Sequence, residues 1–105
     1  MNHYIKEVYY ILKHRKPIEC RDVIKWGKRF ERTHRRVRFN VLNKDLQVST
    51  VFLGFNLSWN GGLDVFETAI IRHGDFEIVG RCDTWRKALK QHWSAVNGLR
   101  RTLLD

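Results

Sequence analysis

Hydrophobic and polar residues alternate along this chain with two different periods, and the period changes at identifiable positions. Residues 4–12, YIKEVYYIL, are rich in β-branched and aromatic side chains and predict a strand. Residues 20–32 have a period near 3.6, which predicts an amphipathic helix. Between them KHRKP, residues 13–17, predicts a charged turn, because proline disfavours a helical conformation in the residue before it.

The middle of the chain has the pattern of an antiparallel sheet. Val37, Phe39 and Val41 alternate with polar residues, which is the period of a half-buried strand. The nearly continuous apolar run that follows predicts a central strand, and later apolar runs predict a hairpin. The predicted boundaries are a turn at 43–45, a strand at 46–55, a loop NLSWNGG at 56–62, a strand at 64–72, a turn at 73–75 and a strand at 76–80.

A second helix is predicted near the end of the chain, with Thr84 or Asp83 as its N-cap. Its apolar stripe comprises Trp85, Ala88, Leu89, His92, Trp93, Val96 and Leu99. The predicted order of elements is therefore β-α-β-β-β-β-α. We predict an α+β fold in which residues 1–105 form a single domain, with an antiparallel sheet of about four to five strands packed by two helices.

Composition limits the class of protein. The 105 residues are about the usual size of one domain, and 43% hydrophobic and 30% charged residues with one proline predict a folded chain. No apolar run is long enough for a membrane span, and the N-terminus lacks the pattern of a signal peptide, so we expect a cytoplasmic protein. Cys20 and Cys82 have no CxxC or CxxH partner, and we interpret them as reduced structural thiols.

Positive charge is the strongest feature of the composition. The formal net charge is +9, and the region 21–38 holds eight positive and two negative residues, which is two-thirds of the excess. Such an excess attracts anions, and nucleic acid is the most abundant intracellular polyanion. The charge therefore predicts that the partner is nucleic acid, or an acidic protein or nucleoprotein complex.

The periodicity divides this basic region into a helix face and a strand. On the helix, the cations share the side opposite Trp26 and Phe30, and on the strand the arginines alternate with the apolar residues. The loop at 56–62 adds Trp59 for base stacking, with a loop anchor folded onto the core as the alternative interpretation. The candidate binding residues are Arg21, Lys25, Lys28, Arg29, Arg32, Arg35, Arg36, Arg38 and Trp59; the alternative for the cations is a solvated face.

Three segments resemble a family of small phage and prophage proteins: VSTVFLGF (48–55), FETAI (66–70) and TWRKALKQHWSAV (84–96). Those proteins share a VSTVFLG strand, an LFET strand and a (S/T)TWEEA…H segment, and the resemblance covers most of residues 9–96. The family has no assigned activity, so the resemblance implies a fold and a phage or prophage setting but no reaction. Arg86 and Lys87 stand where the family has two glutamates, which makes this chain more basic than its relatives.

Catalytic chemistry has no clear signature. Asp64 and Glu67 fall on opposite faces of the predicted strand, and Asp75 lies in a turn. The five histidines lack the HxH, HxxxH and HExxH spacings of metal sites, and His73 is the best of them for acid-base work. We therefore predict no catalytic residue, no metal ligand and no cofactor.

Three functions remain as hypotheses. The first is a non-enzymatic phage or prophage protein that binds an acidic macromolecule through its basic helix and strand. The second is a phage-encoded inhibitor of a host defence system that binds a host protein. The third is a small metal-dependent nuclease that uses Asp64, Glu67 or Glu77 with His73. The sequence leaves the oligomeric state open.

Overall fold

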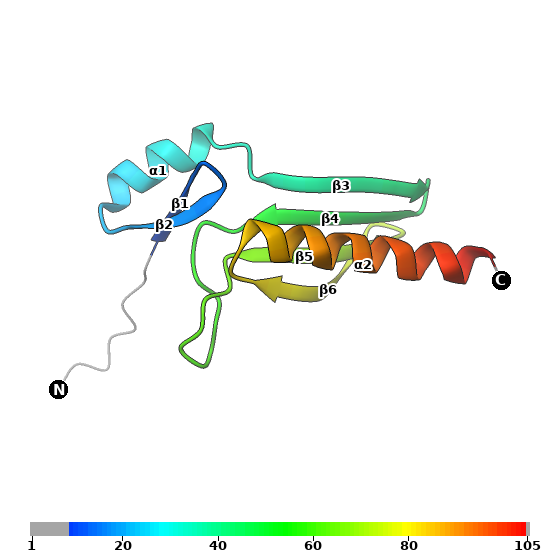
Figure 1. The fold of residues 1–105 in the computed structure, drawn as a ribbon. Helices are drawn as coiled ribbons and strands as arrows, with labels where there is room; N and C mark the ends of the chain where they lie inside the picture. Colours follow the sequence, from blue (N-terminus) through cyan, green and yellow to red (C-terminus); the bar gives the residue numbers. More distant parts are fainter. Residues whose placement is uncertain (1–8, 105) are drawn as a thin grey trace.

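A computed structural model describes residues 9–104, which begin with a β-hairpin (Figure 1). β1 (Tyr9–Lys13) pairs antiparallel with β2 (Lys16–Cys20). His14 and Arg15 form the turn, and both have positive φ, 52° and 67°, as a tight two-residue hairpin turn requires. The predicted strand at 4–12 is confirmed for residues 9–12, and residues 4–8 lie outside the described residues. The predicted turn at 13–17 was too long, because β2 begins at Lys16.

Helix α1 (Val23–Arg32) follows the hairpin and packs against it. It begins at Val23 and not at residue 20, because Cys20 is the last residue of β2. Asp22 is the N-cap, and its Oδ1 accepts hydrogen bonds from the backbone N–H groups of Ile24 and Lys25, both at 3.1 Å. The cap fixes the start of the helix.

The main sheet has four antiparallel strands in sequence order: β3 (Arg36–Asn43), β4 (Leu46–Phe52), β5 (Phe66–Arg72) and β6 (Asp75–Cys82). β4 ends at Phe52 and not at residue 55, because Gly54 has a φ of 81° that a regular strand does not accommodate. The hairpin β1–β2 forms a separate two-stranded sheet. The α+β class is thus confirmed, while the order gains a strand and becomes β-β-α-β-β-β-β-α.

Helix α2 (Trp85–Leu104) lies along one face of the four-stranded sheet (Figure 1). The Thr84 hydroxyl accepts a hydrogen bond from the Lys87 N–H at 3.1 Å, which confirms Thr84 as the cap. The predicted stripe is confirmed where α2 meets the sheet, since Ala88, Val96 and Leu99 are buried. Within residues 9–104, neither helix combines the length and apolarity that a membrane crossing needs.

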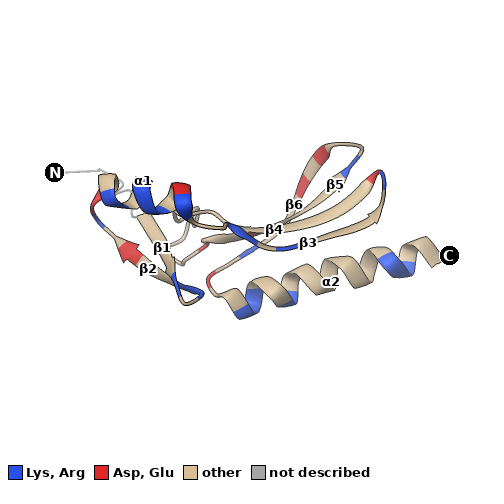
Figure 2. Cartoon of the chain, turned by 90° about the horizontal axis from the view of Figure 1, so that it is seen from above, with Lys and Arg blue, Asp and Glu red and all other residues tan. Residues whose placement is uncertain are grey.

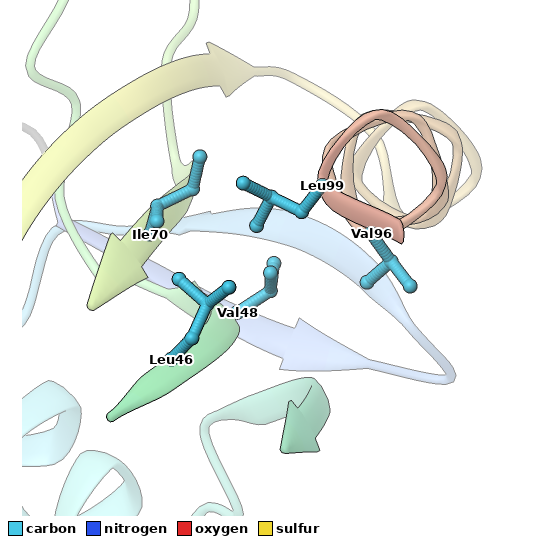
Figure 3. Packing of buried hydrophobic residues seen from close by; sticks show 5 residues of the cluster. All are labelled: Leu46, Val48, Ile70, Val96 and Leu99. Carbon is cyan, nitrogen blue, oxygen red and sulfur yellow. The ribbon is translucent and has the colours of Figure 1, made fainter. Parts of the chain in front are cut away.

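The core consists of two apolar clusters under α2. In the first, Leu46 and Val48 of β4 and Ile70 of β5 lie against Val96 and Leu99 (Figure 3). The second cluster lies nearer the hairpin and comprises Phe52, Val65, Phe66, Cys82 and Ala88, with Tyr10, Leu12 and Phe30 packed against it. The second cluster therefore joins the hairpin and α1 to the main sheet.

A polar network crosses the core between the two clusters. His92 is fully buried; its Nδ1 lies 2.8 Å from the Thr50 hydroxyl, and its Nε2 lies 2.7 Å from Oδ1 of Asn40. The Thr50 and Thr68 hydroxyls are 2.7 Å apart. Because the Asn40 oxygen only accepts, Nε2–H of a neutral His92 donates to it, Nδ1 accepts from Thr50, and Thr50 accepts from Thr68. Both ring nitrogens of His92 therefore have a hydrogen-bond partner.

Candidate functional site

The inner side of α1 is held by an aromatic stack. The ring centroids of Tyr9 and Trp26 are 4.5 Å apart, and those of Trp26 and Phe30 are 4.9 Å apart. The indole Nε1–H of Trp26 donates to the carbonyl oxygens of Tyr10, at 2.9 Å, and Gly54, at 3.0 Å. These contacts come from β1 and from the segment after β4, so they fix the side of α1 that faces the rest of the molecule.

Gly54 is the residue that lets α1 approach so closely. Its φ is 81°, and a Cβ placed on it would lie 2.4 Å from Cε1 of Phe30. Its carbonyl also accepts from the Tyr10 N–H at 2.8 Å. The position therefore needs glycine both for its backbone conformation and for its packing against the Phe30 ring.

Helix α1 carries four exposed cations, Lys25, Lys28, Arg29 and Arg32. Arg29 reaches back to the hairpin, where its Nη2 donates to the Leu12 carbonyl oxygen at 3.4 Å. The i, i+3, i+4 and i+7 spacing of the four cations places them on the face opposite Trp26 and Phe30. Figure 2 shows Lys and Arg positions along α1. Arg29 and Arg32 lie in the last turn, where the helix dipole favours positive charge.

Arg35 adds a cation just beyond the end of the helix, on the side of Phe30. Its guanidinium carbon lies 4.6 Å from the centroid of the Phe30 ring, so the side chain stays beside α1. Together Lys25, Lys28, Arg29, Arg32 and Arg35 form what we call the cationic surface. None of the five forms an ion pair within residues 9–104, and all five are exposed. Two acidic residues lie nearby: Asp22 is engaged as the N-cap, and the exposed Glu31 of α1 forms no ion pair with any of the five.

Three of the predicted binding cations lie apart from this surface. Arg21 is exposed, but it pairs with Glu19 at 2.9 Å. Arg36 and Arg38 do not share one side of the strand as predicted, because a register shift between them pairs Arg36 with Val51 and Arg38 with Thr50. Arg36 consequently stacks on Phe39 on the open face of the sheet, and Arg38 stacks on Trp93 of α2 on the other face.

Trp59 is 97% exposed. The interpretation of this residue as an anchor folded onto the core is therefore wrong. Asn56 orders the loop, because its Oδ1 accepts from the N–H groups of Ser58 and Asp64 and its Nδ2 donates to the Gly62 carbonyl. This loop projects on the opposite side of the hairpin from α1 (Figure 1). Trp59 and the cationic surface are consequently two separate features.

Arg15 is a cation that the candidate list omitted. It lies in the turn of the hairpin, and its guanidinium carbon is 5.1 Å from the centroid of the Trp85 ring at the start of α2. Lys13 and Lys16 beside it are exposed. The KHRK run was the available signal, but without the hairpin it gave no position for these side chains.

The groups considered for catalysis are dispersed. Glu67 pairs with Arg81 at 3.0 Å, while His73 lies in the turn before β6, 3.6 Å from Asp45. Among residues 9–104, no three His, Cys, Asp or Glu side chains are grouped to hold a metal ion. Burial raises the pKa of the Cys82 thiol, which keeps it protonated and poorly nucleophilic.

No family model, curated protein or solved structure matches this chain. The cationic surface is the feature of these residues that departs most from an ordinary solvated face, on which both signs of charge are mixed. It presents positive charge on a helix that is fixed from behind by the stack and by Gly54.

Proposed function

We propose that this chain is a non-enzymatic protein of a phage or prophage that binds nucleic acid through the cationic surface. The supporting observation is that α1 and the three residues after it carry five exposed cations that form no ion pair in the described part of the chain: Lys25, Lys28, Arg29, Arg32 and Arg35. Five neighbouring unpaired cations create a positive potential that attracts a polyanion. The phage setting rests on the resemblance of the strand and helix motifs.

The chemistry of the surface suits phosphate groups. Arginine donates two parallel hydrogen bonds to phosphate oxygens, and lysine contributes a compact charge. Such contacts hold a nucleic acid in place without reading its sequence. The protein would then act by occupying or positioning nucleic acid, for which it needs no catalytic group.

Salt dependence tests this proposal directly. If the five cations neutralise five phosphates of a DNA duplex, the logarithm of the binding constant falls with the logarithm of salt concentration with a slope of about −4.5. Affinity should then fall by roughly 500-fold between about 50 and 200 mM salt. Fluorescence anisotropy with a short labelled duplex measures both quantities.

A pair of charge-reversal variants localises the binding. Lys25→Glu with Lys28→Glu alters the cationic surface, and Arg100→Glu with Arg101→Glu makes the same charge change at the far end of α2. We expect the first variant to lose most of the affinity for the duplex and the second to retain most of it. Equal losses in the two variants, or retention by both, would contradict the assignment to α1.

A second candidate function is binding of a host protein, as an inhibitor of a defence system would do. It is favoured by the face of the sheet opposite α2, where Val41, Phe76 and Ile78 are 62%, 70% and 43% exposed. Capture from host lysate after nuclease treatment separates the two functions. A protein captured by the wild type and lost with Phe76→Ser, but kept with Lys25→Glu and Lys28→Glu, would favour the second.

A further inference from the structure

Aromatic side chains near the cationic surface face inward. The stack half-buries three rings, those of Tyr9, Trp26 and Phe30. The Trp26 Nε1–H donates to two backbone carbonyl oxygens, and the Arg35 guanidinium lies over the Phe30 ring. On α1 and in the segment 33–35 that follows, the structure thus presents no exposed aromatic ring. A nucleic acid on this surface would meet charge and not a stacking platform.

Within residues 9–104, the exposed aromatic side chains are Phe55, Trp59 and Phe76, and none of them belongs to the cationic surface. Trp59 is the most exposed of them, yet the segment 53–65 around it contains Asp64 and no lysine or arginine. Single-stranded nucleic acid is bound by a groove that combines cations for the backbone with aromatic rings for the bases. Here these two components are separated.

A purely electrostatic surface favours the polymer with the higher charge density. Duplex DNA carries one charge per about 1.7 Å of axis, and binding releases more counterions per contact than binding to a single strand, with slopes of about −0.9 and −0.7 for each phosphate. For five contacts, and equal affinities at about 1 M salt, this difference favours the duplex by about 20-fold near 50 mM salt. Without stacking to compensate, a single strand has no offsetting gain.

We infer that the cationic surface recognises the phosphate backbone of double-stranded nucleic acid in preference to a single strand; this inference rests on the proposed function. The contacts run along α1, whose cations from Lys25 to Arg32 span about 10 Å of the helix axis. This length matches neighbouring phosphates of a duplex. Trp59 takes no part in this binding.

Fluorescence anisotropy near 50 mM salt tests the inference with three labelled probes of equal strand length: a mixed-sequence DNA duplex, an RNA duplex of the same sequence, and oligo(dT) as the unpaired single strand. We expect the duplex that binds more tightly to exceed the affinity of oligo(dT) at least about tenfold. Whether that duplex is the DNA or the RNA identifies the preferred type of nucleic acid. Trp59→Ala should leave duplex affinity unchanged, while Lys25→Glu with Lys28→Glu should remove it.

The outcomes separate the two levels of the proposal. Oligo(dT) bound as tightly as either duplex, with Lys25→Glu and Lys28→Glu still abolishing the binding, would overturn the duplex preference and leave the nucleic-acid function standing. Loss of duplex affinity in Trp59→Ala would also overturn it. No salt-sensitive binding to any of the three probes would overturn the proposed function and this inference together.

Discussion

Protonation of His92 should destabilise the fold below neutral pH. The ring is fully buried, and its two nitrogens are already engaged by Thr50 and Asn40 in the arrangement that a neutral imidazole requires. Burial, and secondarily the positive charge of Arg38, lower the pKa of His92 from 6.5 to about 4. A proton added at Nδ1 would face the Thr50 hydroxyl, whose hydrogen now points to that nitrogen.

The sign and size of the effect follow from this pKa. The unfolded chain binds the proton near pH 6.5 and the folded chain only near pH 4, so the stabilising contribution is complete above about pH 6.5 and is lost as the pH falls toward 4. At about 1.4 kcal/mol per pH unit, the total loss is about 3 kcal/mol. About 2 kcal/mol of it should already be lost at about pH 5.

Urea denaturation of the wild type and of His92→Gln across this pH range measures the contribution. The variant should be less stable near neutral pH, because it lacks the imidazole that joins Thr50 to Asn40. Because glutamine does not titrate, the difference in stability between the two proteins should shrink by about 2 kcal/mol by about pH 5. The exposed His34→Gln variant is the control and should follow the wild type. If His92→Gln loses as much free energy as the wild type over the same range, the neutral buried imidazole is refuted.

Two further substitutions test the local structure around α1, each by urea denaturation. Gly54→Ala should lower the free energy of unfolding more than Gly61→Ala, because both have a φ of 81° but only at Gly54 would the new Cβ collide with Phe30; equal losses would contradict the proposed packing. Asp22→Ala should cost about 1 kcal/mol while Asp22→Asn costs little, since asparagine also caps helices, and equal costs would argue against the cap.

The sequence predicted the long elements better than the hairpin before them. The period of 3.6 residues located the stripe of α2, including buried His92, because a single helix on one face of a sheet gives a strong pattern. The β1–β2 hairpin was not recognised, because its turn uses His14 and Arg15 where glycine or asparagine would have given a signal. The error at the end of β4 came from Leu53 and Phe55, apolar residues that continue the pattern of the strand beyond Phe52, where the strand ends.

The candidate site could be predicted only in part, and its helical half was again predicted better than its strand half. Helical spacing placed Lys25, Lys28, Arg29 and Arg32 on one face, and in the structure all four are exposed on α1, with Arg29 turned to the Leu12 carbonyl of the hairpin. Strict alternation placed Arg36 and Arg38 together, and a single inserted residue in β3 moves them to opposite faces. A bulge leaves no mark in a pattern of apolar and polar positions, so the strand half of the predicted surface could not be assigned from the sequence.

The cations of α1 reduce the stability of the helix that carries them. Lys25 with Arg29 and Lys28 with Arg32 are like charges four residues apart, and each pair costs about 0.2–0.5 kcal/mol in an exposed helix. Glutamate at positions 25 and 28 would convert both pairs into favourable ones in the preferred order, acid before base, and this gain exceeds the one new repulsion within the helix, between position 28 and Glu31. The variant that removes the cationic surface should therefore unfold at the same or higher urea concentration. A solvated face has no reason to retain such repulsion, whereas a surface that gains its free energy from phosphate contacts does.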